Sequence, residues 1–284
     1  MLDHPLQRFF NALRPQPTFQ WERFQQRDVL IIDHPACHAV FSRQGAQLLH
    51  FQPAGDKPWL WCAAHWPQAG AIRGGVPVCW PWYGRHPGEG VWPAHGWARL
   101  IDWKLLQSHE DDEGVSLHWR LQLWDWQVDL HARLGARLTL ELVTEHQDSE
   151  PCQVSQALLA YWRIGDVGEV SLSGLEGLEG YDRLSRTACK QRGKLRVDGG
   201  CERVFASTGT LRLDDRAWER SLAMDTGQNQ DTTVWHPGGR PLIGVAGSET
   251  QGFVCVESAT SRSHPLCLAA GEQTHLTLNA IRLS

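Results

Sequence analysis

Apolar and polar residues alternate almost without a break in VSLHWRLQL (residues 115–123), VDLHARL (128–134) and ARLTLEL (136–142). Successive side chains of a β-strand point to opposite faces of the sheet. A period of two therefore indicates strands with one face in a core and the other toward solvent. The pattern predicts three strands in the middle of the chain, each buried on one face only.

Shorter strand-like runs recur along the rest of the 284-residue chain, and Gly, Pro and Asp residues separate them. Helix signals are few, and the best candidate covers residues 4–13. Many short strands favour an all-β fold, and the total size favours an antiparallel sandwich of two large sheets over a small barrel. No repeat, linker or low-complexity tract is found, so we expect one domain over residues 1–284. The shorter runs are 28–32, 39–41, 48–51, 170–172, 195–197, 211–213, 253–256 and 276–278.

Composition excludes several classes of protein. Apolar residues make up 42% of the chain and charged residues 21%, which argues against wholesale disorder. The net charge of −5 offers no basic excess for nucleic acid, and no apolar run approaches the roughly 18 residues of a membrane span. The N-terminal residues lack the apolar stretch of a signal peptide, and the eight cysteines form no CxxC pair. We therefore expect a cytoplasmic protein with reduced thiols, no metal site and no nucleic-acid or membrane partner.

The segment AIRGGVPVCWPWYG at residues 71–84 combines two Gly, two Pro, two Trp and Arg73. Glycine permits positive φ or close backbone approach, and proline fixes φ, so this segment is not a regular strand or helix throughout. It suits either a rigid loop packed on the core or a binding loop in which Arg73 contacts an anion, with the glycines giving the anion room. Composition alone does not separate these two interpretations.

Tryptophan is strongly enriched, with 15 residues in the chain and eight of them between residues 59 and 103. Tryptophan side chains usually pack in the core, and we expect this for most of these residues, including Trp59 and Trp61. Stacking on a sugar is the alternative. Trp80, Trp82 and Trp97 are the candidates for a sugar site because they lie in Gly- and Pro-rich segments.

Two further segments carry candidate functional groups. PAHGWAR at 93–99 places His95 and Arg99 on a Gly-containing turn, which taken alone is more typical of a solvated loop. FVCVE at 253–257 ends an apolar run in Glu257. Partial desolvation there raises the pKa of a carboxyl and suits a general base, although a solvated strand end is the commoner outcome. No P-loop, GxGxxG, HExxH or GxSxG motif occurs, and the His34 and His38 spacing is attributed to chance.

Taken together, these segments resemble the hexose-6-phosphate mutarotases, the glucose-6-phosphate 1-epimerase branch of the aldose 1-epimerase superfamily. The resemblance runs along nearly the whole chain and implies a β-supersandwich (galactose mutarotase-like) fold, with the site on the concave face of the larger sheet. The matching segments are QGAQLLHFQPAG (44–55), RGGVPVCWPWYG (73–84), HGWAR (95–99), ALLAYWRIGD (157–166), SGLEG (173–177), VWHPG (234–238) and FVCVE (253–257).

The resemblance also implies roles for particular residues. Arg73 and Arg99 would bind the phosphate of a hexose phosphate, His95 would line the pocket, and Glu257 would remove the proton from the anomeric hydroxyl. Glu202 stands where the family has an Asp, and it would keep a carboxylate for substrate binding. The implied reaction interconverts α and β anomers through ring opening and needs no cofactor.

One position departs from the family in a way that bears on catalysis. The family's catalytic His, the acid that protonates the ring oxygen, aligns with Leu159, which carries no proton. General acid–base catalysis typically accelerates a reaction by roughly 10²–10⁴-fold. Two functions therefore remain: a hexose-6-phosphate 1-epimerase in which His95, Tyr161 or His236 supplies the proton, and a degenerate protein that binds or senses a phosphosugar. A protein that only mediates interactions would instead leave Arg73 and Arg99 pointing apart.

Overall fold

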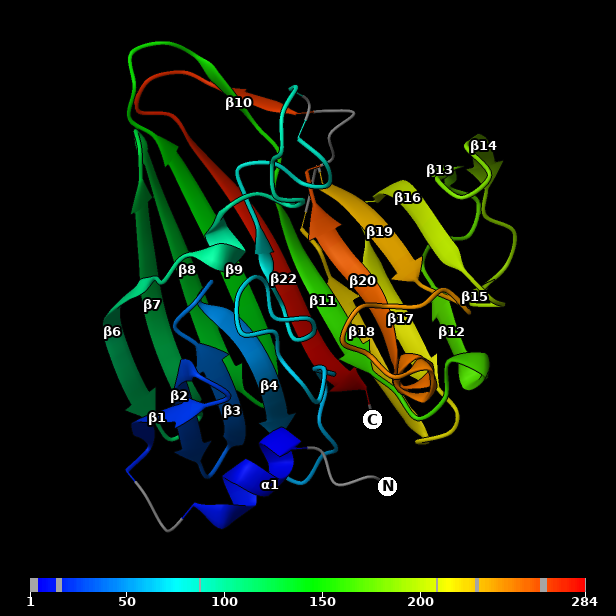
Figure 1. Cartoon of the computed structure of the whole chain (residues 1–284). Helices are drawn as coiled ribbons and strands as arrows, with labels where there is room; N and C mark the ends of the chain where they lie inside the picture. Colours follow the sequence, from blue (N-terminus) through cyan, green and yellow to red (C-terminus); the bar gives the residue numbers. More distant parts are fainter. Residues whose placement is uncertain are drawn as a thin grey trace.

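The computed structural model describes residues 5–13, 17–86, 88–207, 209–227, 230–260 and 265–283. Over these residues the regular secondary structure is almost entirely β, in antiparallel sheets that Figure 1 shows stacked against one another. The three alternating stretches form β7 (Gly114–Leu123), β8 (Trp126–Gly135) and β9 (Arg137–His146). Each shorter run also falls within a strand or begins one, so these sequence predictions are confirmed.

A nine-stranded sheet forms the base of the fold. The inward faces of β7, β8 and β9 carry Val, Leu, Ala and Trp side chains, and the outward faces carry polar residues, because alternate residues of a strand face opposite sides. The strand order is β15 (Leu195–Arg196), β12 (Val170–Ser173), β17 (Thr210–Asp215), β18 (Arg220–Asp225), β22 (Gln273–Leu283), β9, β8, β7 and β6 (Lys104–Asp111).

Two smaller sheets pack over the apolar face of this nine-stranded sheet. Trp119 of β7 is fully buried against Phe41 of the four-stranded sheet, with 5.8 Å between the ring centroids. In the seven-stranded sheet, β11 and β20 contact β22. The four-stranded sheet has the order β1 (Phe19–Phe24), β2 (Arg27–His34), β3 (Cys37–Ser42) and β4 (Gln47–Pro53). The seven-stranded order is β14 (Thr187–Lys190), β13 (Glu179–Asp182), β16 (Cys201–Ser207), β19 (Gln230–His236), β20 (Phe253–Ala259), β11 (Ala157–Arg163) and β5 (Val78–Cys79).

The remaining elements are short. Helix α1 (Pro5–Ala12) packs Leu6 on the second face of the four-stranded sheet, where Val29, Ile31 and Val40 are buried. The predicted helix is therefore confirmed within the described residues, and residue 4 lies outside them. No helix of the described ranges is both long and apolar enough to cross a bilayer. The other elements are β10 (Cys152–Val154), paired with β21 (Leu266–Leu268), and the 3₁₀ turns η1 (Ala98–Leu100), η2 (Val167–Glu169) and η3 (Gly247–Gly252).

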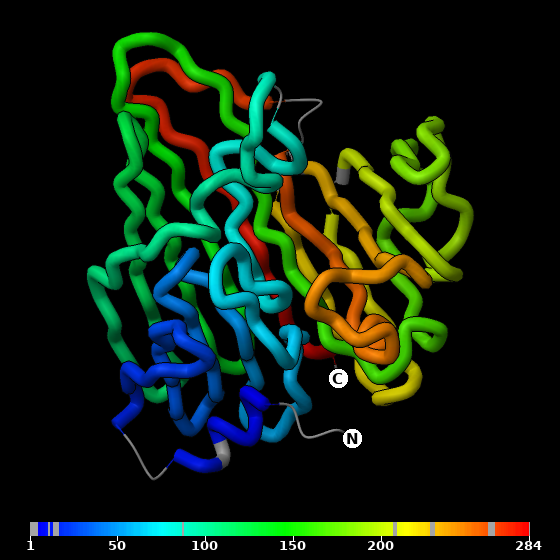
Figure 2. The backbone as a smooth tube through the Cα atoms, viewed as in Figure 1, coloured from blue at the N-terminus to red at the C-terminus, as the bar shows by residue number. Residues whose placement is uncertain are grey.

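The seven-stranded sheet has one face covered by the core and one open face. On β20, Val254 and Val256 belong to the core shared with the nine-stranded sheet, whereas Phe253 and Cys255 pack in a separate cluster on the opposite side. Figure 2 shows the segments between β4 and β6, in cyan to teal, alongside the β11 edge of this sheet, where β5 pairs with β11. Loops of residues 54–103 therefore meet the open face of the seven-stranded sheet.

Candidate active site

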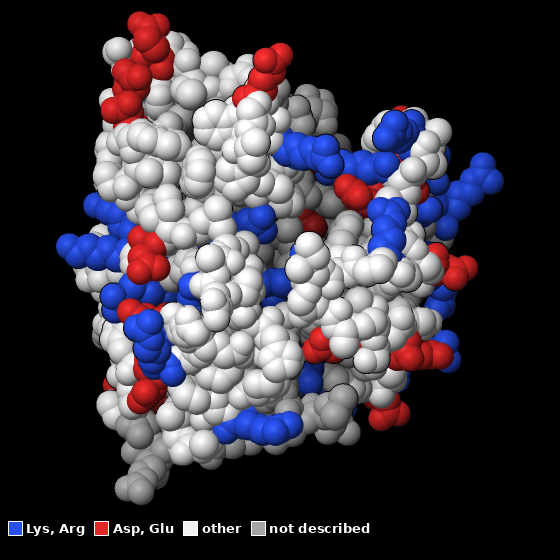
Figure 3. Space-filling view, in the orientation of Figure 1, with Lys and Arg blue, Asp and Glu red and all other residues white. Residues whose placement is uncertain are grey.

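A cavity of about 790 Å³ lies where these loops meet the open face of the seven-stranded sheet. In Figure 3 the hollow on this side of the molecule is surrounded by basic side chains. The family resemblance implied a site on the concave face of the larger sheet, but the inward face of the nine-stranded sheet is filled by the core, and this cavity lies on the smaller, seven-stranded sheet. The cavity is lined by Arg73, Tyr83, Gly84, Arg85, Ala94, His95, Arg99, Leu159, Tyr161, Tyr181, Arg183, Glu202, Thr233, Trp235 and Glu257.

Strand register determines which sheet residues face the cavity. Leu159 of β11 and Thr233 of β19 both pair with Glu257 of β20, so these three side chains form one row across the sheet. Trp235 pairs with Glu202 of β16 in a neighbouring row. All five face the cavity, while the apolar residues that alternate with them point into the core, namely Leu158, Ala160, Val234 and Val256.

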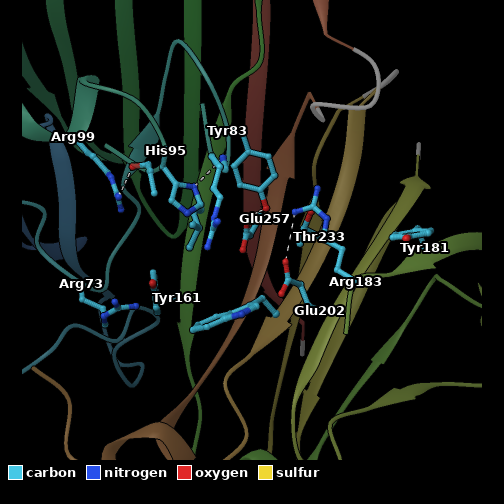
Figure 4. Close-up of a pocket in the computed structure, with 15 residues that line it drawn as sticks. Arg73, Tyr83, His95, Arg99, Tyr161, Tyr181, Arg183, Glu202, Thr233 and Glu257 are labelled. Carbon is cyan, nitrogen blue, oxygen red and sulfur yellow. Dashed lines mark hydrogen bonds and ion pairs between the residues drawn. The ribbon is translucent and has the colours of Figure 1, made fainter. Parts of the chain in front are cut away.

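Glu257 lies on the floor of the cavity and is only 2% exposed. The hydroxyl of Tyr83 donates a hydrogen bond of 2.5 Å to its Oε2 (Figure 4). Burial raises the pKa of Glu257 to about 8, and Glu202 adds to the rise, while the Tyr83 hydrogen bond and the charge of Arg183 oppose it. A carboxyl group with this pKa can take up and release a proton near neutral pH.

Four arginines line this cavity within the described residues, although the whole chain is acidic. Arg99 donates from Nη2 to the Ala94 carbonyl at 2.6 Å, and its buried Nε has no protein partner. Arg183 lies 3.6 Å from Glu202 and places its guanidinium 5.8 Å from the centre of the Tyr83 ring. A concave site with this excess of guanidinium groups favours an anionic ligand.

His95 enters the cavity from a residue with φ of 64°. Its Nδ1 accepts a hydrogen bond of 3.3 Å from the Gly84 N–H, which assigns the ring hydrogen to Nε2. Burial, and then the charges of Arg99, Arg183 and Arg73, lower the pKa of His95 to about 3. His95 is therefore a neutral hydrogen-bond donor at physiological pH, and it has no readily transferred proton.

The glycines of the RGG segment have a different role from the one expected. A Cβ on Gly74 would lie 2.3 Å from the Cα of Cys62, and one on Gly75 would lie 2.0 Å from the Leu48 carbonyl oxygen, with φ of 115° and 60°. They allow the loop to pack against neighbouring backbone, so the expectation that they make room for an anion is wrong. The close packing holds Arg73 in place at the edge of the cavity.

The three residues considered as a replacement acid lie in different places. His95 and Tyr161 line the cavity, and burial raises the pKa of Tyr161 well above its ordinary value. His236 follows Trp235 on β19 and so faces the other side, where its Nε2 donates to the Thr250 carbonyl at 2.9 Å. The suggestion that His236 protonates the substrate is therefore wrong.

None of the three candidate tryptophans lines the cavity. Trp80 is fully buried in the core, and Trp82 and Trp97 pack together at a ring distance of 6.3 Å outside the cavity lining. Trp235 lines the cavity instead, from a regular strand. The expected core positions of Trp59 and Trp61 are confirmed.

Sequence reasoning missed Tyr83, Arg85, Arg183 and Thr233. Tyr83 lies inside the quoted WPWYG segment, so its hydroxyl was a signal that could have been used. Arg183 follows the short strand β13 and reaches the cavity only because β13 pairs with β16. No group of three or more His, Cys, Asp or Glu residues in the described part of the chain could hold a metal ion.

The sequence profile of the family described as Aldose 1-epimerase matches residues 28–280. The chain belongs to the aldose 1-epimerase family. A protein from Escherichia coli named "Putative glucose-6-phosphate 1-epimerase" is 33% identical over 264 residues, which are 86% of each chain. A Salmonella typhimurium protein with the same name is 30% identical over 261 residues, 85% of this chain and 86% of the relative.

The crystal structure of a "putative mutarotase" from Salmonella typhimurium superposes with a TM-score of 0.90 at 25% identity and covers 99% of this chain and 100% of its own. The family resemblance and the antiparallel β-supersandwich predicted from the sequence are thereby confirmed. The family and the names of these relatives support an epimerase, or mutarotase, activity on a sugar.

Proposed function

We propose that this aldose 1-epimerase family member interconverts the α and β anomers of a hexose 6-phosphate, with glucose 6-phosphate as the substrate to test first. The observation that carries the proposal is a buried carboxyl group, Glu257, on the floor of a cavity lined by four arginines in the described chain. Guanidinium groups bind phosphate through paired, charge-assisted hydrogen bonds. The names of the Escherichia coli and Salmonella relatives support the same substrate class.

Arg73 and Arg99 are the proposed phosphate ligands. Both line the cavity on the side away from Arg183, as Figure 4 shows, and both also line a smaller adjoining cavity of about 390 Å³. The buried Nε of Arg99 has no protein partner, so a donor is left for a ligand oxygen. A phosphate held there places the sugar ring over the sheet, toward Glu257.

Glu257 is the proposed general base for the anomeric hydroxyl. Its raised pKa allows it to accept the O1 proton and return it after the ring has opened and C1 has rotated. His95 donates from Nε2 to a sugar oxygen, and Glu202 accepts from a sugar hydroxyl. Proton transfers complete the reaction, so the proposal includes no cofactor.

The test is anomer exchange of glucose 6-phosphate followed by NMR and corrected for the spontaneous rate. We expect acceleration that Glu257→Gln removes, while the affinity for glucose 6-phosphate stays within a few-fold. Arg99→Ala should raise KM for glucose 6-phosphate by about tenfold or more, because a charge-assisted hydrogen bond contributes roughly 1.5–3 kcal/mol. Exchange of unphosphorylated glucose should not respond to Arg99→Ala.

Arg216→Ala is the matched control, because the Arg216 side chain is 70% exposed and lies outside the cavity. This variant should retain the KM of the wild type. If glucose and glucose 6-phosphate are exchanged equally well and Arg99→Ala changes neither, the assignment of a phosphosugar substrate is wrong.

A second candidate function rests on Leu159. This side chain occupies the row position next to Glu257 and provides no proton. A protein that binds a phosphosugar without turning it over would show a normal binding isotherm for glucose 6-phosphate and no exchange above the spontaneous rate. Binding and exchange measured on one sample separate the two functions.

A further inference from the structure

Tyr83 and Glu257 form a hydrogen-bonded polar pair on the cavity floor (Figure 4). The two residues are 174 positions apart in the chain, and the side chain of Tyr83 is almost fully buried. The Tyr83 backbone is fixed as well, because its N–H donates to the Ser155 hydroxyl at 3.0 Å. The phenol oxygen is therefore held against the carboxylate by a rigid loop.

We propose that Tyr83 is a catalytic residue of this protein, and that its hydroxyl gives the ring oxygen the proton that Leu159 cannot supply. This inference rests on the proposed function and deepens it. The geometry favours it because O1 and O5 of the sugar are bonded to the same carbon atom and lie close together. A carboxylate oxygen and a phenol oxygen 2.5 Å apart present a base and an acid at a matching separation.

The proton transfers balance within the pair. Glu257 takes the proton from O1, the C1–O1 bond becomes a carbonyl, and the C1–O5 bond breaks with its electrons going to O5. O5 takes the phenol proton of Tyr83, and the proton on Glu257 then moves to the phenolate. The pair ends in its starting protonation state, with one proton carried from O1 to O5, and the same steps in reverse close the ring on the other face.

The electrostatics of the pair supports this order of events. Burial raises the pKa of Tyr83, and the charge of Glu257 and its hydrogen bond add to the rise, while a hydrogen bond with the Thr233 side chain and the charge of Arg183 oppose it. When Glu257 accepts the O1 proton, its negative charge disappears and the phenol becomes a stronger acid. Uptake of the first proton thus assists release of the second.

The other candidates for this step are less suited. His95 has a pKa of about 3, so its imidazole carries no extra proton to donate. Tyr161 pairs with Cys255, two residues before Glu257 on β20, and so lies in the next row of the sheet. Tyr83 alone among the three makes a hydrogen bond to the proposed base.

The test compares Tyr83→Phe with the wild type in anomer exchange and in binding of glucose 6-phosphate. Removing one hydroxyl keeps the ring and its packing, so the dissociation constant should stay within about threefold, while kcat should fall by roughly 10²-fold or more. The double variant Tyr83→Phe/Leu159→His should have a kcat at least tenfold higher than that of Tyr83→Phe, because a histidine in the row next to Glu257 restores an acid.

A kcat for Tyr83→Phe within threefold of the wild type would overturn the role of Tyr83 and leave the proposed function standing. A wild-type protein that fails to accelerate exchange would overturn both. A measurement on the wild type alone guards against misfolding of the variant. Transfer of both the O1 proton and the Tyr83 proton during ring opening predicts a curved dependence of the exchange rate on the deuterium fraction of the solvent. A linear dependence would count against the relay.

Discussion

Replacing Glu257 by Gln should make the protein more stable at alkaline pH while removing its activity. In the folded protein the pKa of Glu257 is about 8, against an ordinary value of 4.5. Between these values the folded state keeps a proton that the unfolded state has released, so stability falls as pH rises, by about 1.4 kcal/mol per pH unit. From about pH 5 to about pH 9 the wild type therefore loses ~4 kcal/mol that the variant does not lose.

The assay is urea unfolding of both proteins at several pH values, with the free energy of unfolding extrapolated to water. Other titrating groups are shared and cancel in the difference. The amide of the variant still accepts from Tyr83, and any penalty for its buried NH₂ is independent of pH, so the slope of the difference is the decisive quantity. If the difference between the two proteins changes by less than about 1 kcal/mol over this range, burial does not raise the pKa of Glu257 as described.

Two further outcomes follow from the same structure. The kcat/KM for glucose 6-phosphate should rise about tenfold per pH unit below pH 8 and level off above it, because only the ionised form of Glu257 accepts a proton; a flat profile from pH 6 to 9 would contradict a base of this pKa. Gly75→Ala should lower the free energy of unfolding by more than ~2 kcal/mol, because its Cβ would meet the Leu48 carbonyl oxygen at 2.0 Å. Gly55 has a similar positive φ of 72° but open space around it, so Gly55→Ala should lower the free energy of unfolding by only about 1–2 kcal/mol. Equal losses in the two glycine variants, measured by urea unfolding, would show that the close contact at Gly75 is unimportant.

The fold was predictable where burial is one-sided. Residues 115–142 alternate because one face of β7, β8 and β9 meets the core and the other meets solvent. The edge strand β6 was not found, because most of Lys104–Asp111 is exposed on both faces and carries no apolar pattern. Its position follows from pairing with β7, which is a tertiary property.

The candidate site was predictable where several functional groups share one short segment. Arg73, His95, Arg99 and Glu257 each lie in a motif and all line one cavity. The tryptophan assignment was wrong because Gly- and Pro-rich sequence was equated with exposure. In the structure, a Cβ at Gly96 would lie 2.0 Å from the Trp80 carbonyl oxygen, so these glycines allow loops to pack tightly and bury their aromatic residues.

The remaining site residues depend on distant pairing. Tyr83 meets Glu257 only after β20 has joined β11 in the sheet, and Arg183 reaches the cavity through the pairing of β13 with β16. Neither contact can be predicted from local sequence. The pattern of a strand shows which of its faces is buried, but it does not show which residue of another strand lies opposite.

The position of β22 affects how this protein can fold during synthesis. This strand follows all the others along the described chain, yet it lies in the interior of the nine-stranded sheet, between β18 and β9, as the red trace in Figure 2 shows. Until the ribosome has released it, β9 and β18 each expose an unpaired edge, and the two halves of the sheet remain separate. Newly made chains are therefore most prone to aggregate until β22 has been made and has paired with both edges, and a chaperone that shields strand edges would act at that stage.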